Sequence, residues 1–188
     1  MVRWASGAQE RLQQAAHVLF ARCGFDGVTV AEIAAEAGLT ERTFFRYFAD
    51  KREVLFSGQE AFQAVFLERL AATDEAPPMT MVAAALEGVA DFFPDERRPW
   101  SRARQAVIDE EPRFQERELL KLSALAAALT RGLVDRGIGA TAATLAAENG
   151  VAVFRVAFSQ WLADGEERSL LAIQRQVLEE LHAVVGAR

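Results

Sequence analysis

Apolar residues recur along most of the chain at intervals of three and four positions, the spacing of helices that bury one face. No stretch alternates apolar and polar residues for long enough to predict a strand. The first helix is expected to run from near Ala8 to Arg22, followed by two short helices and a longer one. After a break at Pro77-Pro78, further helices are expected over about 80–93, 100–110, 113–136, 141–163 and 167–185. The pattern predicts an all-α protein of about nine helices.

Explicit start signals mark the short helices. Thr29 followed three residues later by Glu32 forms a capping box, and the same pattern begins at Asp50. Thr40 can cap a helix between these two, and Gly38 precedes it where a tight turn needs a positive φ. A helix, a glycine-containing turn, a second helix and a further capped helix therefore follow one another within about 30 residues. This order is typical of a helix-turn-helix.

The helix capped by Thr40 separates aromatic residues from polar ones. At about 100° per residue, Phe44 and Phe48 share one face with Phe45 beside them, so we expect these three rings to anchor the helix. The opposite face carries cations and hydroxyls, which in DNA-binding helices reach bases and phosphates. These outward residues are Arg42, Thr43, Arg46 and Tyr47.

Lys51 is placed by the Asp50 start signal in the first turn of the next helix. The positive end of a helix dipole disfavours a cation there, unless an anion such as a phosphate lies at the same end. The alternative is a solvated surface lysine that costs the helix little. Because Lys51 follows the polar face just described, we favour a phosphate contact.

The net charge of −6 argues by itself against a nucleic-acid-binding protein, but its distribution does not. The first 57 residues hold seven basic and seven acidic side chains, and residues 40–52 alone hold four basic and two acidic ones. The acidic excess therefore lies entirely in residues 58–188. Such asymmetry indicates two parts with different partners. We expect a DNA-binding domain over 1–56 and a second, helical domain over 57–188.

Residues 8–56 resemble the DNA-binding domain of the tetracycline-repressor (TetR) family of bacterial transcriptional regulators. The resemblance rests on Gly24-Phe25-Asp26-Gly27-Val28-Thr29-Val30, on Ile33-Ala34 and Ala37-Gly38-Leu39, and on Phe44-Phe45-Arg46-Tyr47-Phe48 with Lys51. The rest of the chain matches the family only in length and helical character. The resemblance implies a three-helix domain, in which the helix from Thr40 to Tyr47 enters the major groove.

The resemblance also implies roles for individual residues. By position, it assigns contacts with the DNA backbone to Thr29, Tyr47 and Lys51, and an approach to the bases to Arg42 and Thr43. Many family members have tyrosine where this chain has Phe45, so this ring would touch only sugar or a thymine methyl group. The full set expected at the DNA is Thr29, Thr40, Glu41, Arg42, Thr43, Phe45, Arg46, Tyr47 and Lys51.

One recognition helix covers only a few base pairs, so specific binding needs a second copy about one turn of DNA away. The helix expected over 141–163 has two apolar stripes and would therefore be buried on two sides. Its second stripe and the last helix would pair with a second chain in a four-helix contact, which is also the family pattern. The alternative is a helix at the centre of a monomeric core. The expected contact residues are Leu145, Ala152, Val156, Ala163, Ile173, Val177 and Leu181.

The helices of the larger domain carry many aromatic side chains. Aromatic residues at helical spacing are more often core, but these could also line a cavity for a small apolar or aromatic effector. Polar groups on the same helices would then orient the effector. The candidate ligand-binding residues are Phe92, Phe93, Trp100, Arg104, Phe114, Asn149, Phe154 and Phe158.

The composition limits other functions. Cys23 is the only cysteine and the chain has two histidines, so an internal disulfide is impossible and metal ligands are scarce. We expect no metal and no cofactor. The sequence contains neither a phosphate-binding glycine loop nor a nucleophile–histidine–carboxylate set, so we do not expect an enzyme. No apolar run approaches the roughly 18 residues of a membrane span, and the first residues do not resemble a signal peptide, so we expect a cytoplasmic protein.

The sequence thus predicts a homodimeric repressor that binds a near-palindromic DNA operator and is released by a small apolar or aromatic effector. One alternative is a helical interaction module, which would leave the outward polar face after Thr40 unexplained. Another is a regulator controlled by a partner protein instead of a small molecule, and the sequence leaves this alternative open.

Overall fold

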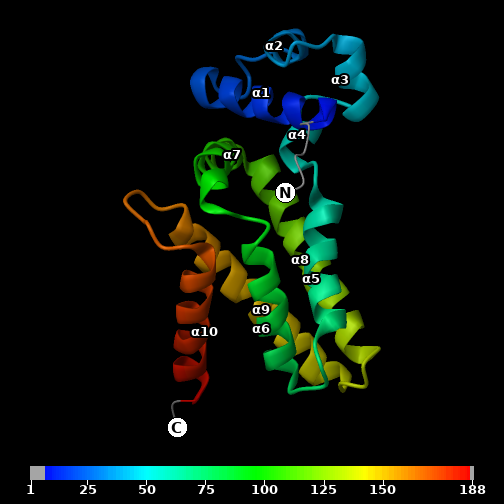
Figure 1. The fold of residues 1–188 in the computed structure, drawn as a ribbon, viewed down its shortest axis with the longest axis vertical. Helices are drawn as coiled ribbons and strands as arrows, with labels where there is room; N and C mark the ends of the chain where they lie inside the picture. The colour runs from blue at the N-terminus through cyan, green and yellow to red at the C-terminus, as the bar shows by residue number, and fades with distance from the viewer. Residues whose placement is uncertain (1–6, 187–188) are drawn as a thin grey trace. The chain divides into compact units, whose positions relative to one another are not determined.

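The structure, a computed structural model of the chain, describes residues 7–186 (Figure 1). This part of the chain contains ten α-helices, one short 3-10 helix and no strand, so the predicted all-α fold class is confirmed. None of the described helices is long and apolar enough to cross a membrane. The elements are α1 (Ala8–Cys23), α2 (Val30–Glu36), α3 (Glu41–Tyr47), α4 (Glu53–Phe56), α5 (Gln59–Ala72), α6 (Pro78–Ala90), η1 (Asp95–Arg97), α7 (Arg98–Glu110), α8 (Pro112–Val134), α9 (Ala140–Trp161) and α10 (Leu170–Gly186).

The described residues form two compact units. The first contains the chain up to Gly58 together with Pro99–Gln115, and the second contains Gln59–Arg98 and the chain from Glu116 onward. Helices α1–α4 and nearly all of α7 therefore belong to the first unit, and α5, α6, α9, α10 and most of α8 belong to the second. Each unit has its own buried apolar cluster.

The core of the first unit is built on the apolar stripe of α1, against which α2, α3 and α4 pack. Leu12 and Phe20 on this stripe are at most 2% exposed. Phe114, in the first turn of α8, lies edge-to-face with Phe25 at 4.9 Å between ring centres and meets Phe56 at 5.9 Å. Residues 99–115 thus complete a core whose other members precede residue 58. Helical periodicity predicts which face of a helix is buried, but not against which distant element it packs.

The longer helix expected after Asp50 is divided in two. Helix α4 ends at Phe56, and Gly58 has a φ of 85°, a conformation that other residues rarely adopt. The hydroxyl of Ser57 donates to the carbonyl of Val54 at 2.7 Å and accepts from the amide of Gln13 at 2.6 Å. These bonds tie the end of α4 to α1, so α4 belongs to the first unit while α5 begins the second.

The second unit has α6 packed against α5, α9 and α10. Two glycines permit close approaches between helices. A Cβ at Gly150 of α9 would collide with Val82 of α6, and one at Gly132 of α8 would lie 2.9 Å from the side chain of Leu70 in α5. An aromatic cluster fills much of the space between these helices. Its rings, each in contact with at least one other, are Phe62, Phe66, Phe92, Phe93, Phe154, Phe158 and Trp161.

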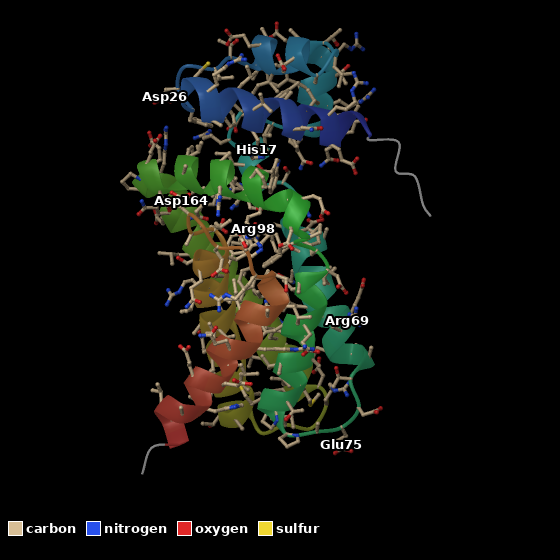
Figure 2. The ribbon with its side chains drawn as sticks, turned by 60° about the vertical axis from the view of Figure 1, so that its left-hand side comes forward. His17, Asp26, Arg69, Glu75, Arg98 and Asp164 are labelled. Atoms are coloured by element: carbon tan, nitrogen blue, oxygen red, sulfur yellow. The ribbon has the colours of Figure 1, made fainter. Side chains whose placement is uncertain are left out.

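Arg98 ties the start of α7 to the connection between α9 and α10 (Figure 2). Its buried guanidinium donates to Asp95 Oδ1 at 2.6 Å, to the backbone oxygen of Arg168 at 2.6 Å and to that of Glu166. It also lies 5.1 Å from the ring centre of Trp161, whose Nε1 donates to the same Asp95 oxygen at 3.2 Å. Arg98 is the last residue of this segment of the second unit, and Pro99 belongs to the first unit. The contacts of Arg98 therefore anchor the end of that segment.

Candidate nucleic-acid interface

The capping box predicted at Thr29 is present and starts α2. The amide of Glu32 donates to Thr29 Oγ1 at 3.2 Å, and the amide of Thr29 donates to Glu32 Oε2 at 2.7 Å. The hydroxyl of Thr29 donates to the same carboxylate at 2.8 Å. Because these bonds favour the ionised carboxylate, they hold the pKa of Glu32 below its ordinary value. Thr29 is exposed, at the start of the first helix of the helix-turn-helix.

The turn between α2 and α3 depends on Gly38. Its φ is 63°, and the amide of Leu39 donates to the carbonyl of Ala34 at 2.8 Å, which closes α2. Arg11 of α1 donates to the carbonyls of Ala37 and Gly38 on the other side of the turn. A Cβ at residue 38 would lie 2.9 Å from the Arg11 Nη2 atom. The turn is therefore held from two sides, and it sets the orientation of α3 relative to α2.

Helix α3 is anchored by two phenylalanines, and the prediction of a third anchor is wrong. Phe44 is 0% and Phe48 is 3% exposed, with 5.2 Å between their ring centres. Phe45 is 55% exposed and meets Phe44 edge-on at 5.5 Å. One step of about 100° along the helix is enough to turn the side chain of Phe45 from the core to the surface. Phe45 therefore joins the exposed residues of α3.

The remaining side chains of α3 are polar and most of them are exposed. The hydroxyl of Thr40 caps the helix by accepting from the amide of Thr43 at 3.2 Å. Arg46 Nη2 donates to Tyr47 Oη at 3.0 Å, and its guanidinium lies 4.8 Å from the centre of that ring. Arg42 is exposed and forms no hydrogen bond or ion pair with another residue in the part of the chain that the structure describes. Glu41 is exposed as well, at the start of the helix.

The start signal at Asp50 predicted Lys51 in the first turn of a helix, and this prediction is wrong. Helix α4 begins at Glu53, whose amide donates to Asp50 Oδ1 at 3.1 Å. Lys51 lies in the turn before it, and its Nζ donates to the carbonyls of Phe25 at 2.6 Å and Val28 at 2.7 Å. Burial lowers the pKa of Lys51. The lysine therefore holds the connection between α1 and α2.

The residues expected to bind a ligand fall into separate groups. Phe92, Phe93, Phe154 and Phe158 meet in the aromatic cluster of the second unit, with Phe93 and Phe158 at 4.9 Å between ring centres. Asn149 donates to the carbonyl of Leu145 in its own helix at 2.7 Å. The other three belong to the first unit. They are Trp100, which meets His17 at 4.3 Å between ring centres, Arg104, which donates to the carbonyl of Leu55 at 2.7 Å, and Phe114.

The residues expected at a dimer contact also differ in their placement. On α9, Leu145 is 59% and Val156 is 43% exposed, and Ala152 lies near the same side. Ala163 is exposed but lies beyond the end of α9 at Trp161. On α10, Leu181 is half-buried. Ile173 and Val177 are only 0% and 7% exposed, because α10 packs on α6 and α9 of its own chain.

Gln174 is a buried polar residue that sequence reasoning missed. It is 3% exposed, and neither atom of its amide has a hydrogen-bond partner among the described residues. It lies between Ile173 and Val177 on the buried side of α10, where every other buried residue is apolar. A glutamine within that apolar stripe is the signal that could have found it. The described residues contain no group of three or more histidine, cysteine or carboxylate side chains placed to hold a metal ion.

The first unit therefore has the architecture of a helix-turn-helix DNA-binding domain, with the exposed polar residues on its second helix. Two family models match the chain. The model of bacterial regulatory proteins of the tetR family matches residues 12–57, and that of the MftR C-terminal domain matches residues 76–186. The chain belongs to the TetR family of bacterial transcriptional regulators.

Solved structures support the fold. A TetR-like transcriptional regulator from Rhodococcus sp. RHA1 is 18% identical, with each chain covered completely and a TM-score of 0.62. SmeT, the repressor of the Stenotrophomonas maltophilia multidrug efflux pump SmeDEF, is 19% identical over 94% of this chain and 89% of its own, with a TM-score of 0.61. AibR in complex with isovaleryl coenzyme A and operator DNA is 16% identical over 92% of this chain and 97% of its own, with a TM-score of 0.53. A comparison with curated protein sequences found no match.

Proposed function

We propose that this protein is a homodimeric cytoplasmic repressor, which binds a near-palindromic operator through α3 and is released by a small apolar or aromatic effector. The division of α3 carries the proposal: Phe44 and Phe48 are buried, while Arg42 and its polar neighbours reach solvent. A helix divided in this way can lie in the major groove while its apolar side stays in the protein. Membership of the TetR family supports the same function.

The proposed contacts divide into readout and positioning. Arg42 would read a base, because its exposed guanidinium has no partner among the described residues and arginine can bond guanine at two atoms. Thr40, Glu41, Thr43 and Phe45 would lie along the same groove, with the ring of Phe45 against sugar or a thymine methyl group. Arg46, Tyr47 and Thr29 would contact phosphates. Lys51 would act mainly by holding the connection from which Thr29 emerges.

Dimer formation is supported by the exposed side of α9. Leu145, Ala152 and Val156 recur at helical spacing there and leave an apolar patch in contact with water. Ala163 is exposed just beyond the end of the helix. The same patch on two copies can close a two-fold contact. A two-fold dimer presents two copies of α3 to successive turns of the major groove, which a near-palindromic operator would match.

An effector site is supported by the aromatic cluster of the second unit. Phe92, Phe93 and Phe158 are only half-buried, so the cluster is not sealed on every side. The buried amide of Gln174 has no hydrogen-bond partner among the described residues, and a carbonyl or hydroxyl of an effector could satisfy it. AibR, which has the same fold, was solved with both an acyl thioester and operator DNA, and an acyl thioester is therefore one effector class to test.

Release of DNA would use the connections between the two units. The chain passes from one unit to the other at Gly58, at Arg98–Pro99 and at Gln115–Glu116. An effector that favours another arrangement of the second unit would move these connections and change the spacing between the two copies of α3. Because α3 must fit successive grooves, a shift of a few ångströms is enough to weaken operator binding.

Selection of bound duplexes from a random DNA library tests the DNA-binding proposal. We expect enrichment of sites with two-fold symmetry and half-sites about 10 base pairs apart, centre to centre. The Arg42→Ala chain, run in parallel, should enrich the same arrangement with relaxed preference at one position in each half-site. Enrichment of no sequence, or of sites without symmetry, would contradict the proposal.

A further inference from the structure

Helix α8 carries an exposed apolar stripe in the second unit. Leu120 is 65% and Val134 is 42% exposed, and between them on the same side lie three small, partly or fully exposed residues and Arg131. At about 100° per residue, these side chains fall within an arc of about 100°. A single exposed leucine is ordinary, but an apolar stripe along several turns marks a contact surface. The set, here called the α8 stripe, is Leu120, Ser123, Ala124, Ala127 and Val134.

Two opposite charges flank the centre of the α8 stripe. Glu116 and Arg131 lie in line with it, about 22 Å apart along the helix axis. Both are exposed, and neither forms a hydrogen bond or an ion pair with any residue the structure describes. Lys121 and Glu118, which lie off the stripe, are paired instead, with 3.3 Å between Nζ and Oε1. One charge of each sign, neither paired with a described residue, thus lies on either side of the centre of the stripe.

A second copy of the helix, placed antiparallel about a two-fold axis, complements both features. With the axis between Ser123 and Ala124, Glu116 of each copy faces Arg131 of the other, and Leu120 faces Ala127. A parallel pair would instead bring Glu116 against Glu116 and Arg131 against Arg131, which is unfavourable. We propose that a second copy of this chain docks on the α8 stripe in the antiparallel orientation.

The small residues of the stripe explain how two such helices can approach closely. In packed helices a side chain inserts between four residues of the facing helix. Leu120 of one copy would enter the space between residues 124, 127, 128 and 131 of the other, three of which are alanines. Next to this space, a groove of about 430 Å³ lies between α5 and α8 and is bordered by Ala128 and Arg131. The α8 stripe of one copy thus has room for Leu120 of the other copy.

This contact is separate from the dimer contact proposed through α9 and α10. Within the second unit, Figure 1 shows α10 at the left and α8 with α5 toward the right. A chain that uses both surfaces would assemble beyond a dimer. The inference rests on α8 alone and does not require DNA binding, so either proposal can fail without the other.

Disulfide trapping tests the register of the pair. In a chain whose exposed Cys23 is replaced by serine, Ala124→Cys places a thiol beside the proposed axis, within reach of its counterpart. Leu119→Cys is the control, because Leu119 is 56% exposed but lies about 100° from Leu120 around the helix. Under mild oxidation we expect the Ala124→Cys chain to cross-link at least about tenfold faster than the control. Equal rates would overturn the proposal.

Charge reversal tests the orientation in the same Ala124→Cys background. Glu116→Arg alone and Arg131→Glu alone each place like charges together and should slow cross-linking by about fivefold. The two changes combined restore opposite charges and should return the rate to that of the parent. Both positions are exposed, so circular dichroism should show an unchanged helix content for every variant. The antiparallel orientation would be overturned if neither single reversal slowed cross-linking, or if the double variant cross-linked no faster than the single variants.

Discussion

Arg46 and Tyr47 form a pair on the exposed side of α3, with Arg46 Nη2 donating to Tyr47 Oη at 3.0 Å. The guanidinium also lies over the ring, 4.8 Å from its centre. The hydroxyl keeps its own proton to donate, and arginine holds it in place. Two neighbouring residues are thus arranged as one group of donors, which suits a phosphate oxygen.

Tyr47→Phe should weaken DNA binding without changing its dependence on salt. The change removes a hydroxyl but no charge, so we expect a loss of about 1.5 kcal/mol for every operator sequence alike. Arg46→Ala should also reduce the slope of log affinity against log salt concentration by about one, because it removes a positive charge that would lie near the DNA phosphates. Fluorescence anisotropy at several salt concentrations measures both. A Tyr47→Phe protein that binds like the parent would remove Tyr47 from the interface.

Gly38→Ala should destabilise the first unit. Alanine would have to adopt a φ of 63° and would bring a Cβ to 2.9 Å from Arg11 Nη2, so we expect a loss of about 1–2 kcal/mol in the free energy of unfolding. Gly139→Ala is the matched control, because Gly139 has a φ of −58° and open space around its Cβ position. Urea unfolding followed by circular dichroism compares the two. Equal stability of both variants would show that the turn tolerates a side chain.

The capping box at Thr29 should make the stability of α2 sensitive to acid. The bonds from Thr29 lower the pKa of Glu32, so the folded state binds this proton less tightly than the unfolded chain does. The contribution is therefore complete above the ordinary pKa of 4.5 and is lost as the pH falls through the lowered value.

Glu32→Gln should reduce that sensitivity, because glutamine accepts hydrogen bonds without titrating. The measurement is the melting temperature between about pH 6 and pH 3 for the parent and the variant. We expect the parent to lose more stability over this range. Parallel curves would show that the capping box does not contribute to the acid sensitivity.

Gln174→Met should stabilise the protein and reduce its response to an effector. The amide is buried without a partner, and replacing it by an apolar group of similar shape should raise the free energy of unfolding by about 1–2 kcal/mol. Gln176→Met on the exposed side of α10 is the control and should change stability little. A destabilised Gln174→Met protein would mean that the amide serves only the fold.

Local signals predicted the helix-turn-helix well. The caps at Thr29 and Thr40 each depend on residues three positions apart, the positive φ at Gly38 depends on the glycine itself, and all three are present. The prediction that Phe45 anchors α3 is wrong because a step of one residue, about 100° around the helix, carries its ring from the side of Phe44 to the surface.

Contacts between distant residues could not be predicted in this way. Lys51 donates to the carbonyls of Phe25 and Val28, more than 20 positions earlier in the chain. The capping signal at Asp50 could not predict these partners. The break at Gly58 is reinforced by a bond from Gln13 to Ser57, and Phe114 joins a core formed by residues before position 58. Helical periodicity carries no information about such partners.

The most direct test of the account is the operator affinity of the Arg42→Ala protein beside that of Arg22→Ala. Both arginines are exposed, but Arg42 lies on α3 and Arg22 lies at the end of α1. For a duplex recovered by selection, we expect Arg42→Ala to cost about 1–3 kcal/mol and to lose discrimination at one base pair in each half-site, with Arg22→Ala unchanged. Equal affinities for the parent and both variants would contradict the claim that the exposed side of α3 reads DNA.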